Sequence, residues 1–426
     1  MTSTPRNERI HIGIFGRRNA GKSSLINALS NQDVSVVSPV KGTTTDPVYK
    51  SMELLPIGPV VLIDTPGIDD IGELGEQRVK KTRAILRKTD IAILVVGVDC
   101  KMNDDDNQLV EMFEGAGIGY VIVNNVSSQD SSTFCATSHA LVAEIDWHEK
   151  SKTELSTLPQ RAAISQKNLP TIYVNADTKS NIETLKAAVV AISGTSTITI
   201  PIVSDLLTAR ACDVVVLVTP IDEAAPKGRL ILPQQQVIRD ILDVNCIPVL
   251  TQVDSLPATI SSLRHAPKMV ITDSQVFGEV AQIVPESIPL TSFSILMARY
   301  KGVLSDAVKG AKSIDTIKDG DNILISEGCT HHRQCDDIGT VKIPRMIEKH
   351  TGAKPVYTFS SGGEFPDDLS KFALVIHCGG CMLNAREMMY RNQFAKSLDI
   401  PMTNYGVVIS HMQGILERCV APFGIS

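Results

Sequence analysis

The first part of the chain alternates short apolar runs with longer amphipathic stretches, a pattern typical of strands and helices that form a parallel sheet. The apolar runs predict strands at residues 10–15, 60–63, 91–96, 121–123 and 171–174. The pattern ends near residue 192, and a Ser- and Thr-rich segment, residues 193–200, follows it. Such a segment is typical of a linker, so we predict a first α/β domain over residues 1–194.

The rest of the chain predicts two further α/β domains, over residues 201–288 and 289–426. In the middle domain we expect strands at residues 213–218, 247–250 and 268–271, a helix after Pro233 and a helix over residues 275–284. In the last domain we expect strands at residues 323–325, 355–359 and 373–376, helices over residues 343–350 and 385–398, and a final strand and helix between residues 407 and 419. The acidic run at residues 104–106 is expected to be a solvated loop.

The composition of the 426 residues, 43% hydrophobic and 21% charged, indicates a folded globular chain. The 41 Lys and Arg against 47 Asp and Glu give a formal charge of −6, so we expect no broad attraction to nucleic acid or anionic lipid. No apolar run approaches the roughly 18 residues of a membrane helix and no signal-peptide layout opens the chain, which predicts a cytoplasmic protein. The matrix of an organelle in an anaerobic organism is the alternative location. Nine cysteines, an odd number, argue for metal binding rather than for a disulfide framework.

A phosphate-binding motif follows the first predicted strand. Residues 16–23 read G-x-x-x-x-G-K-S and lead into an apolar stretch that predicts a helix. In this arrangement the backbone N–H groups of a glycine-rich turn surround phosphate oxygens, and the start of the helix adds its dipole. Lys22 would then neutralise the outer phosphates, and the hydroxyl of Ser23 is placed for Mg²⁺.

Two further segments agree with a nucleotide site. Asp64 ends an apolar strand and begins the sequence D-T-P-G, which closes at Gly67. A carboxylate at the carboxyl end of such a strand is placed to hold Mg²⁺. Between the two motifs, residues 42–46 (GTTTD) form a polar stretch that can order around a γ-phosphate, as switch loops do.

The order of these motifs resembles the TrmE/Era-like GTPases of tRNA modification and ribosome assembly. The resemblance implies GTP as the nucleotide and an activating K⁺ on Asn19. It also implies Mg²⁺ on Ser23, Thr44 and Asp64. Ile68 stands where other GTPases carry a catalytic Gln, which suits slow hydrolysis stimulated by K⁺.

Base recognition departs from the pattern of these GTPases. They carry N-K-x-D, whose Asp accepts two hydrogen bonds from guanine, whereas this chain has Asn124 and, three residues later, Ser127. A Ser hydroxyl accepts more weakly, so either guanine selectivity is reduced or the base is read mainly by backbone groups, such as the amide of Ala176. The residues assigned to the nucleotide site are Gly16, Asn19, Ala20, Gly21, Lys22, Ser23, Ser24, Thr43, Thr44, Asp64, Gly67, Asn124 and Ala176.

Cysteine and histidine residues follow two predicted strands of the last domain. They are Cys329 and His331 after the first strand, and His377, Cys378 and Cys381 after the second. A C-x-x-C segment turns two thiolates toward one centre, and Cys329 reaches the same centre if the two strands are neighbours in a parallel sheet. The spacing is compatible with structural zinc and with an iron–sulfur cluster alike. Cys335 is close enough in sequence to Cys329 to be a fourth ligand or a residue of a solvated loop. The other cysteines stand singly and are expected to be small core residues or incidental thiols.

The P-loop domain, the linker, the middle domain and the pattern C-x-H…H-C-x-x-C together resemble the HydF family, GTPases that act as scaffolds in the maturation of iron-iron hydrogenases. The resemblance covers almost the full length of the chain. It implies a 4Fe–4S cluster on Cys329, Cys378 and Cys381. Three thiolates leave one iron open. The candidates for a labile ligand there, or for groups that orient the ligands through hydrogen bonds, are His331, His377 and Asp336.

The resemblance implies a GTP-hydrolysing scaffold that carries a transient 2Fe subcluster and delivers it to apo iron-iron hydrogenase. The implied partners are this hydrogenase and two radical-SAM maturases, and the implied assembly is a homodimer through the middle domain, or a tetramer. The alternative function is an RNA-modification or ribosome-assembly GTPase with a structural zinc site. The negative net charge and the aromatic content of 4% argue against an RNA-binding surface, so we expect no nucleic-acid partner and no membrane association.

Overall fold

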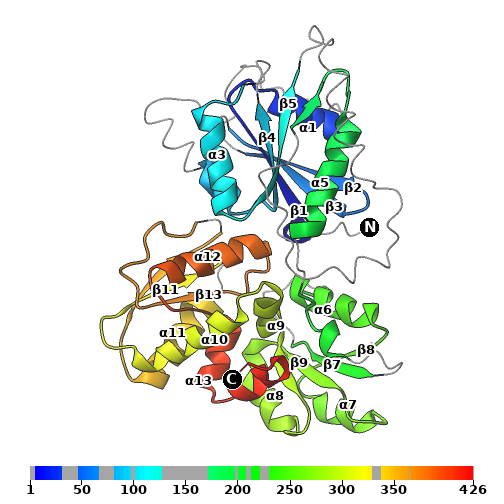
Figure 1. Ribbon diagram of the computed structural model, residues 1–426. Coiled ribbons are helices and arrows are strands. Elements are labelled where there is room, and N and C mark those ends of the chain that lie inside the picture. Colours follow the sequence, from blue (N-terminus) through cyan, green and yellow to red (C-terminus); the bar gives the residue numbers. More distant parts are fainter. Residues whose placement is uncertain are drawn as a thin grey trace. The chain divides into compact units, whose positions relative to one another are not determined.

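The computed structural model describes residues 5–30, 47–66, 81–96, 101–126, 171–196, 200–207, 213–220, 230–328, 337–362 and 364–425. The chain divides into two compact units, Met1–Ile198 and Thr199–Ser426 (Figure 1). The division falls within the Ser- and Thr-rich segment whose composition indicates a linker. Within the described ranges, every helix is too short or too polar to span a lipid bilayer.

The first unit is built on a six-stranded sheet in the order β2-β3-β1-β4-β5-β6. Its strands are β1 (Ile10–Phe15), β2 (Val48–Leu54), β3 (Gly58–Asp64), β4 (Ile91–Val96), β5 (Gly119–Asn125) and β6 (Ile172–Val174). All neighbours pair in parallel except β2, which is antiparallel to β3. The apolar runs predict the other five strands, but they miss β2 because Lys50, Ser51 and Glu53 interrupt its apolar residues.

Helices α1 (Lys22–Ser30), α3 (Asp104–Gly115) and α5 (Ile182–Ser196) cover this sheet. Apolar side chains of α1 and α5 pack on one face, and Leu109 and Phe113 of α3 pack on the other. Because both faces are covered, β1 and β4 are buried along nearly their whole length, which explains their continuous apolar sequences. The phosphate and base motifs follow the carboxyl ends of these parallel strands, the usual place for a ligand in such a fold.

The acidic residues 104–106 form the first turn of α3, so the expectation of a solvated loop is wrong. Asn103 caps the helix, since its Oδ1 accepts a hydrogen bond from the amide of Asp106 and its own amide donates to the Asp106 carboxylate. Carboxylates are favoured in a first turn by the helix dipole. Asp106 is fully buried and pairs with Arg17 Nε at 3.3 Å, which ties the phosphate-binding loop to α3.

The second unit contains two four-stranded parallel sheets, in the orders β10-β9-β7-β8 and β12-β11-β13-β14. The strands are β7 (Val214–Val218), β8 (Ile247–Thr251), β9 (Met269–Thr272), β10 (Leu290–Ser292), β11 (Asn322–Ser326), β12 (Val356–Ser360), β13 (Leu374–His377) and β14 (Met402–Asn404). The α-helices are α6 (Leu232–Asp243), α7 (Leu256–Ser262), α8 (Phe277–Ile283), α9 (Phe293–Tyr300), α10 (Leu304–Lys312), α11 (Ile343–Thr351), α12 (Ala385–Ser397), α13 (Tyr405–Met412) and α14 (Leu416–Val420). The predicted α/β class, a P-loop domain with a parallel sheet followed by two further α/β domains, is confirmed.

Helices of the last domain share one apolar core with the first of these sheets. Val216 and Leu290 of the first sheet belong to the same buried cluster as Val308 of α10 and Val407 of α13. The domain boundary suggested between residues 288 and 289 lies just before β10, and β10 pairs with β9 in the first of these sheets. Packing between the middle and last domains is therefore part of the fold.

The end of the last domain differs from its predicted order. Residues 407–410, expected to begin a strand, lie in α13, and β14 precedes this helix. Asn404 ends β14 and caps α13, because its side chain accepts a hydrogen bond from the amide of Val407 at 2.8 Å. Most residues of this helix are buried, so its sequence is a continuous apolar run like that of a buried strand.

Candidate nucleotide and metal sites

The phosphate-binding loop has a backbone that requires its glycines. Gly16 and Gly21 have φ angles of +140° and +90°, a region that side chains disfavour. A Cβ atom at Gly16 would lie 2.3 Å from the carbonyl oxygen of Val95, so this turn passes too close to β4 for any other residue. Asn19, the residue assigned to K⁺, is exposed and has a φ of +60°.

The structure brings Lys22, Ser23 and Asp64 together. Lys22 is buried, and its Nζ donates to the carbonyl oxygens of Gly16 at 2.9 Å and Arg17 at 2.7 Å. Ser23 Oγ donates to Asp64 Oδ2 at 2.7 Å, which joins the start of α1 to the end of β3. Burial raises the pKa of Asp64, while the hydrogen bond from Ser23 and the charge of Lys22 oppose the rise. An ammonium beside a hydroxyl and a carboxylate fits a phosphate group with its Mg²⁺.

Asn125 is a site residue that the motifs did not assign. It ends β5 beside Asn124, which is buried. Its Nδ2 donates to the carbonyl oxygen of Ala20 at 3.5 Å, and its Oδ1 accepts from the amide of Ala176 at 3.3 Å. The Ala176 amide, assigned to the guanine base, is thus bonded to a side chain that connects two loops of the site. The one sequence signal for Asn125 is its position, where related GTPases carry the Lys of N-K-x-D.

The structure describes two further residues assigned to the nucleotide site, while other assigned residues lie outside the described ranges. Ser24 is exposed on the first turn of α1, and Ala20 is buried in the core beneath the phosphate-binding loop. The assigned residues outside the described ranges are Thr43, Thr44, Gly67, Cys329, His331 and Asp336, and Ile68 and Ser127 also lie there.

The cysteine site lies at the carboxyl edge of the last sheet. β11 and β13 are parallel neighbours, with Ser326 beside His377. The amides of Gly328 and Gly380 donate to Sγ of Cys378, at 3.1 and 3.3 Å. The chain that leaves β11 therefore contacts the C-x-x-C loop one residue before the first of the assigned cysteines. The neighbouring parallel strands that a shared centre requires are present.

Two glycines allow this close approach. Gly380 has a φ of +61°, and a Cβ atom there would lie 2.7 Å from Sδ of Met388. A Cβ atom at Gly328 would lie 2.8 Å from Cγ of Leu383 and 3.5 Å from Cα of Gly380. A side chain at Gly328 would push its segment away from the cysteine loop, and one at Gly380 would be strained by the positive φ. Cys378 and Cys381, which the loop carries, lie at partly exposed positions.

The surroundings of Cys378 disfavour a free thiolate. Burial raises the pKa of its thiol, and the amides of Gly328 and Gly380 oppose the rise. The carboxylate of Glu327 raises this pKa further; Glu327 is buried and accepts a hydrogen bond from the Tyr405 hydroxyl at 3.2 Å. Such a thiol stays protonated at neutral pH unless a cation stabilises its anion, as a bound metal does. The thiols, the N–H donors and the glycine turn fit a zinc or an iron–sulfur centre.

His377 is fully buried, and hydrogen bonds engage both of its ring nitrogens. Nδ1 lies 2.8 Å from the carbonyl oxygen of Cys378, and Nε2 lies 3.0 Å from Nη1 of Arg391. Because a carbonyl only accepts and a guanidinium only donates, Nδ1 carries the proton and Nε2 accepts. Burial, followed by the charge of Arg391, lowers the pKa of His377 to about 3. Arg391 is in turn paired with Glu387 of α12 at 2.9 Å, so neutral His377 holds the cysteine loop onto this helix.

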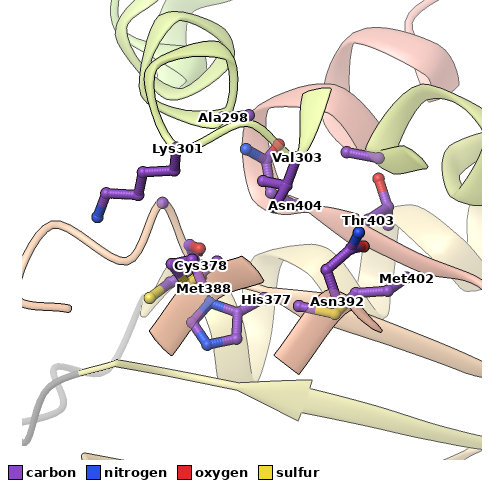
Figure 2. Close-up of a pocket in the computed structure, with 12 residues that line it drawn as sticks. Ala298, Lys301, Val303, His377, Cys378, Met388, Asn392, Met402, Thr403 and Asn404 are labelled. Atoms are coloured by element: carbon purple, nitrogen blue, oxygen red, sulfur yellow. Dashed lines mark hydrogen bonds between the residues drawn. The ribbon is translucent and has the colours of Figure 1, made fainter. Parts of the chain in front are cut away.

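A buried lysine enters the cysteine site from the end of α9. Lys301 Nζ donates to the carbonyl oxygens of Gly380 and of Leu383, the latter at 2.8 Å. Lys301, His377 and Cys378 line one pocket (Figure 2), whose free space is about that of one water molecule. No motif indicates Lys301, because it stands about eighty residues before the loop that it contacts. Its charge favours anionic species at the cysteines.

Comparison with known proteins relates the first unit to GTPases. Residues 11–126 match the family model described as 50S ribosome-binding GTPase. The chain is 43% identical over 105 residues to the tRNA modification GTPase MnmE of Roseiflexus sp., and 39% identical over 119 residues to GTPase Der of Wolinella succinogenes. These matches cover 24% and 27% of this chain but only 22% and 25% of the relatives. A crystal structure of Era from Aquifex aeolicus aligns with 43% of this chain and 56% of its own, at 20% identity and a TM-score of 0.33.

The second unit matches two models of a different kind. Residues 202–302 match the hydrogen maturase F dimerization domain, and residues 305–422 match the hydrogen maturase F tetramerization domain. The first model spans the β10-β9-β7-β8 sheet, and the second spans the sheet that carries Cys378 and Cys381. With a GTPase domain before both, the chain belongs to the hydrogen maturase F (HydF) family.

Proposed function

We propose that this protein is a GTP-hydrolysing scaffold that binds a 4Fe–4S cluster and delivers a di-iron subcluster to apo iron-iron hydrogenase. The observation that carries the proposal is the contact between the chain leaving β11 and the C-x-x-C loop. Gly328, which precedes Cys329, donates to Cys378 Sγ at 3.1 Å, so we expect a third thiolate within reach of the two in the loop. Membership of the HydF family supports hydrogenase maturation as the setting.

The nucleotide half of the proposal is GTP hydrolysis with Mg²⁺. Lys22 binds the outer phosphates, and Ser23 and Asp64, with Thr44, hold the metal ion. The exposed Asn19 is the proposed ligand of a K⁺ that accelerates an otherwise slow reaction. Turnover in KCl compared with NaCl tests this part, and equal rates in the two salts would contradict the K⁺ site.

In the proposed cluster site, three cysteine thiolates bind iron, those of Cys329, Cys378 and Cys381. When bound in this way, a four-iron cluster offers one iron to an exchangeable ligand. The protein's own contribution is to orient the loop, and His377 does so through its hydrogen bonds to a loop carbonyl and to α12. His331 and Asp336 are the proposed labile groups at the exchangeable position.

Exposed sheet edges support assembly into oligomers, in agreement with the dimerization and tetramerization models that the chain matches. β8 is an edge strand, and its Ile247 and Leu250 are 45% and 43% exposed. β12 is the edge of the other sheet and exposes Val356 and Phe359. Apolar edge strands are favourable surfaces for pairing with another chain. We propose a homodimer through the middle domain, with the hydrogenase and two radical-SAM maturases as further partners.

Anaerobic reconstitution with iron and sulfide tests the cluster. We expect a brown protein with about four iron atoms per chain, whose absorption and electron paramagnetic resonance are those of a 4Fe–4S cluster. Cys378→Ser should abolish both signals, whereas Cys419→Ala, which removes a thiol buried in the core, should keep them. A colourless protein whose bound zinc is lost in Cys378→Ser would contradict the proposal and favour an RNA-modification or ribosome-assembly GTPase.

A further inference from the structure

Three side chains outside both sites converge on one point of the last domain. Asp315 lies in the short 3-10 helix η5 (Ser313–Thr316), His350 in the last turn of α11, and His411 in the last turn of α13. One ligand atom from each lies within 4.8 Å of those of the other two. Neither the GTPase motifs nor the cysteine pattern includes any of these residues.

The geometry is close to that of a metal site. His350 Nε2 is 2.8 Å from Asp315 Oδ1, and His411 Nε2 is 3.0 Å from Asp315 Oδ2. The two imidazole rings are 5.9 Å apart and present the same nitrogen to one carboxylate. In a tetrahedral zinc site with metal–ligand bonds near 2.0–2.1 Å, neighbouring ligand atoms lie roughly 3.3 Å apart. The two histidine–carboxylate distances therefore need to lengthen by only a few tenths of an ångström, and the two imidazole nitrogens lie within 4.8 Å of each other.

The electrostatics also favour a cation. Although partial burial raises the pKa of Asp315, hydrogen bonds from His350 and His411 outweigh it and hold this pKa below its usual value. Both histidines are at the carboxyl ends of helices, where the dipole favours positive charge. Their side chains are 30% and 18% exposed, and that of Asp315 is 50% exposed, so solvent reaches the three ligands.

This cluster lies at the opposite edge of the sheet from the cysteines. η5 precedes β11 and α11 precedes β12, and the first residues of these two strands, Asn322 and Val356, are paired. The cysteine loop follows the other end of β13. We propose that Asp315, His350 and His411 bind a divalent transition-metal ion of the zinc type, with water as the fourth ligand. Such an ion joins η5, α11 and α13 and is independent of the cluster.

Titration of the full-length, cluster-reconstituted protein with Zn²⁺ against a chromophoric chelator tests the site. We expect one Zn²⁺ per chain, bound equally well by the wild type and by Cys378→Ser. Asp315→Asn, His350→Gln and His411→Asn should each lower the affinity at least about tenfold, because each removes a ligand. His265→Asn is the matched control, since His265 is an exposed histidine of the same unit that is not part of the cluster.

Thermal unfolding gives a second measurement. Zn²⁺ should raise the melting temperature of the wild type and of His265→Asn, and should leave that of His411→Asn unchanged. Equal zinc affinity in the wild type and the three ligand variants would overturn the proposal. Loss of the bound zinc in Cys378→Ser would overturn it as well, because the ion would then belong to the cysteines. If Asp315→Asn fails to fold, the zinc affinity of His350→Gln, which keeps a hydrogen-bonding side chain, tests the site in its place.

Discussion

Each of the two sites contains a buried lysine whose ammonium donates to two backbone carbonyls, yet the two lysines reach their partners differently. The carbonyls that hold Lys22 belong to its own loop, five and six residues before it. Those that hold Lys301 lie 79 and 82 residues after it, in the loop that follows β13. The lysine of the phosphate loop is thus held by local contacts. The cysteine loop, in contrast, depends on packing between segments far apart in the chain.

This difference predicts whether a substitution at each site also affects other parts of the fold. A lysine held by carbonyls of its own loop can be removed with little effect on distant parts of the fold, while Arg17 and Ser23 still join the loop to α3 and β3. A site assembled from distant segments is sensitive to changes in residues that never touch the metal. The predictions below test this contrast, beginning with the largest expected effect.

Lys22→Ala should lower GTP hydrolysis by at least about a hundredfold, because the ammonium that stabilises charge on the transferred phosphoryl group is removed. Iron content and cluster absorption after reconstitution should be unchanged. Phosphate release and iron analysis on the same preparation measure both quantities. Lys101→Ala, which removes an exposed lysine from the same unit, is the control and should keep full activity. Loss of the cluster together with hydrolysis would contradict the independence of the two sites.

His377 should make the cluster-free protein sensitive to acid. Its pKa is about 3 when folded and about 6.5 when unfolded, so the unfolded state binds more protons between these values. The stability contributed by neutral His377 is therefore full above pH 6.5 and is lost as the pH falls toward 3. The free energy of unfolding should decrease by up to about 1.4 kcal/mol per pH unit in this window.

Urea unfolding between pH 4 and 8 measures this slope. His377→Gln should be less stable at neutral pH but should show a flatter pH dependence, because the titrating group is gone. His265→Gln, at an exposed position, should keep the slope of the wild type. Identical slopes in His377→Gln and the wild type would mean that other groups cause the acid sensitivity.

Ser127→Asp should tighten GTP binding by an order of magnitude or more. A carboxylate accepts hydrogen bonds from guanine more strongly than a hydroxyl does, by roughly 1–2 kcal/mol. Equilibrium titration with a fluorescent GTP analogue measures the change, and the same titration with an ATP analogue is the control. Unchanged GTP affinity would indicate that the base is read elsewhere, for which the loop joined by Asn125 and Ala176 is the nearest candidate.

The same contrast explains what could be predicted from the sequence. The P-loop and Asp64 are recognisable because each belongs to a short motif of consecutive residues. The apolar runs that end just before the cysteines predicted β11 and β13 as strands, but their pairing, on which a shared centre depends, came from the structure. Lys301 and Arg391 carried no signal, because helix packing brings them to the cysteine loop. The acidic run of α3 was misread because the capping box between Asn103 and Asp106 begins a helix there, which the run of charges alone does not reveal.

Lys301→Met should make the reduction potential of the cluster more negative. The ammonium lies beside the cysteine loop, where its charge stabilises the added electron, and Met keeps the length of the side chain without the charge. We expect up to roughly a tenfold lower ratio of reduced to oxidised cluster at a fixed potential, which corresponds to about 59 mV for one electron. This shift is the smallest of the effects, because the substitution removes a single charge and no ligand of the cluster.

Redox titration followed by electron paramagnetic resonance measures the shift in Lys301→Met. Lys312→Met, which removes an exposed lysine from α10, should leave the potential unchanged because solvent and salt screen that charge. GTP hydrolysis should be the same in both variants, as expected if Lys301 acts on the cysteine site alone. An unaltered potential in Lys301→Met would mean that the lysine only fastens the loop. The two buried lysines would then differ in their partners but share a purely structural anchoring to backbone carbonyls.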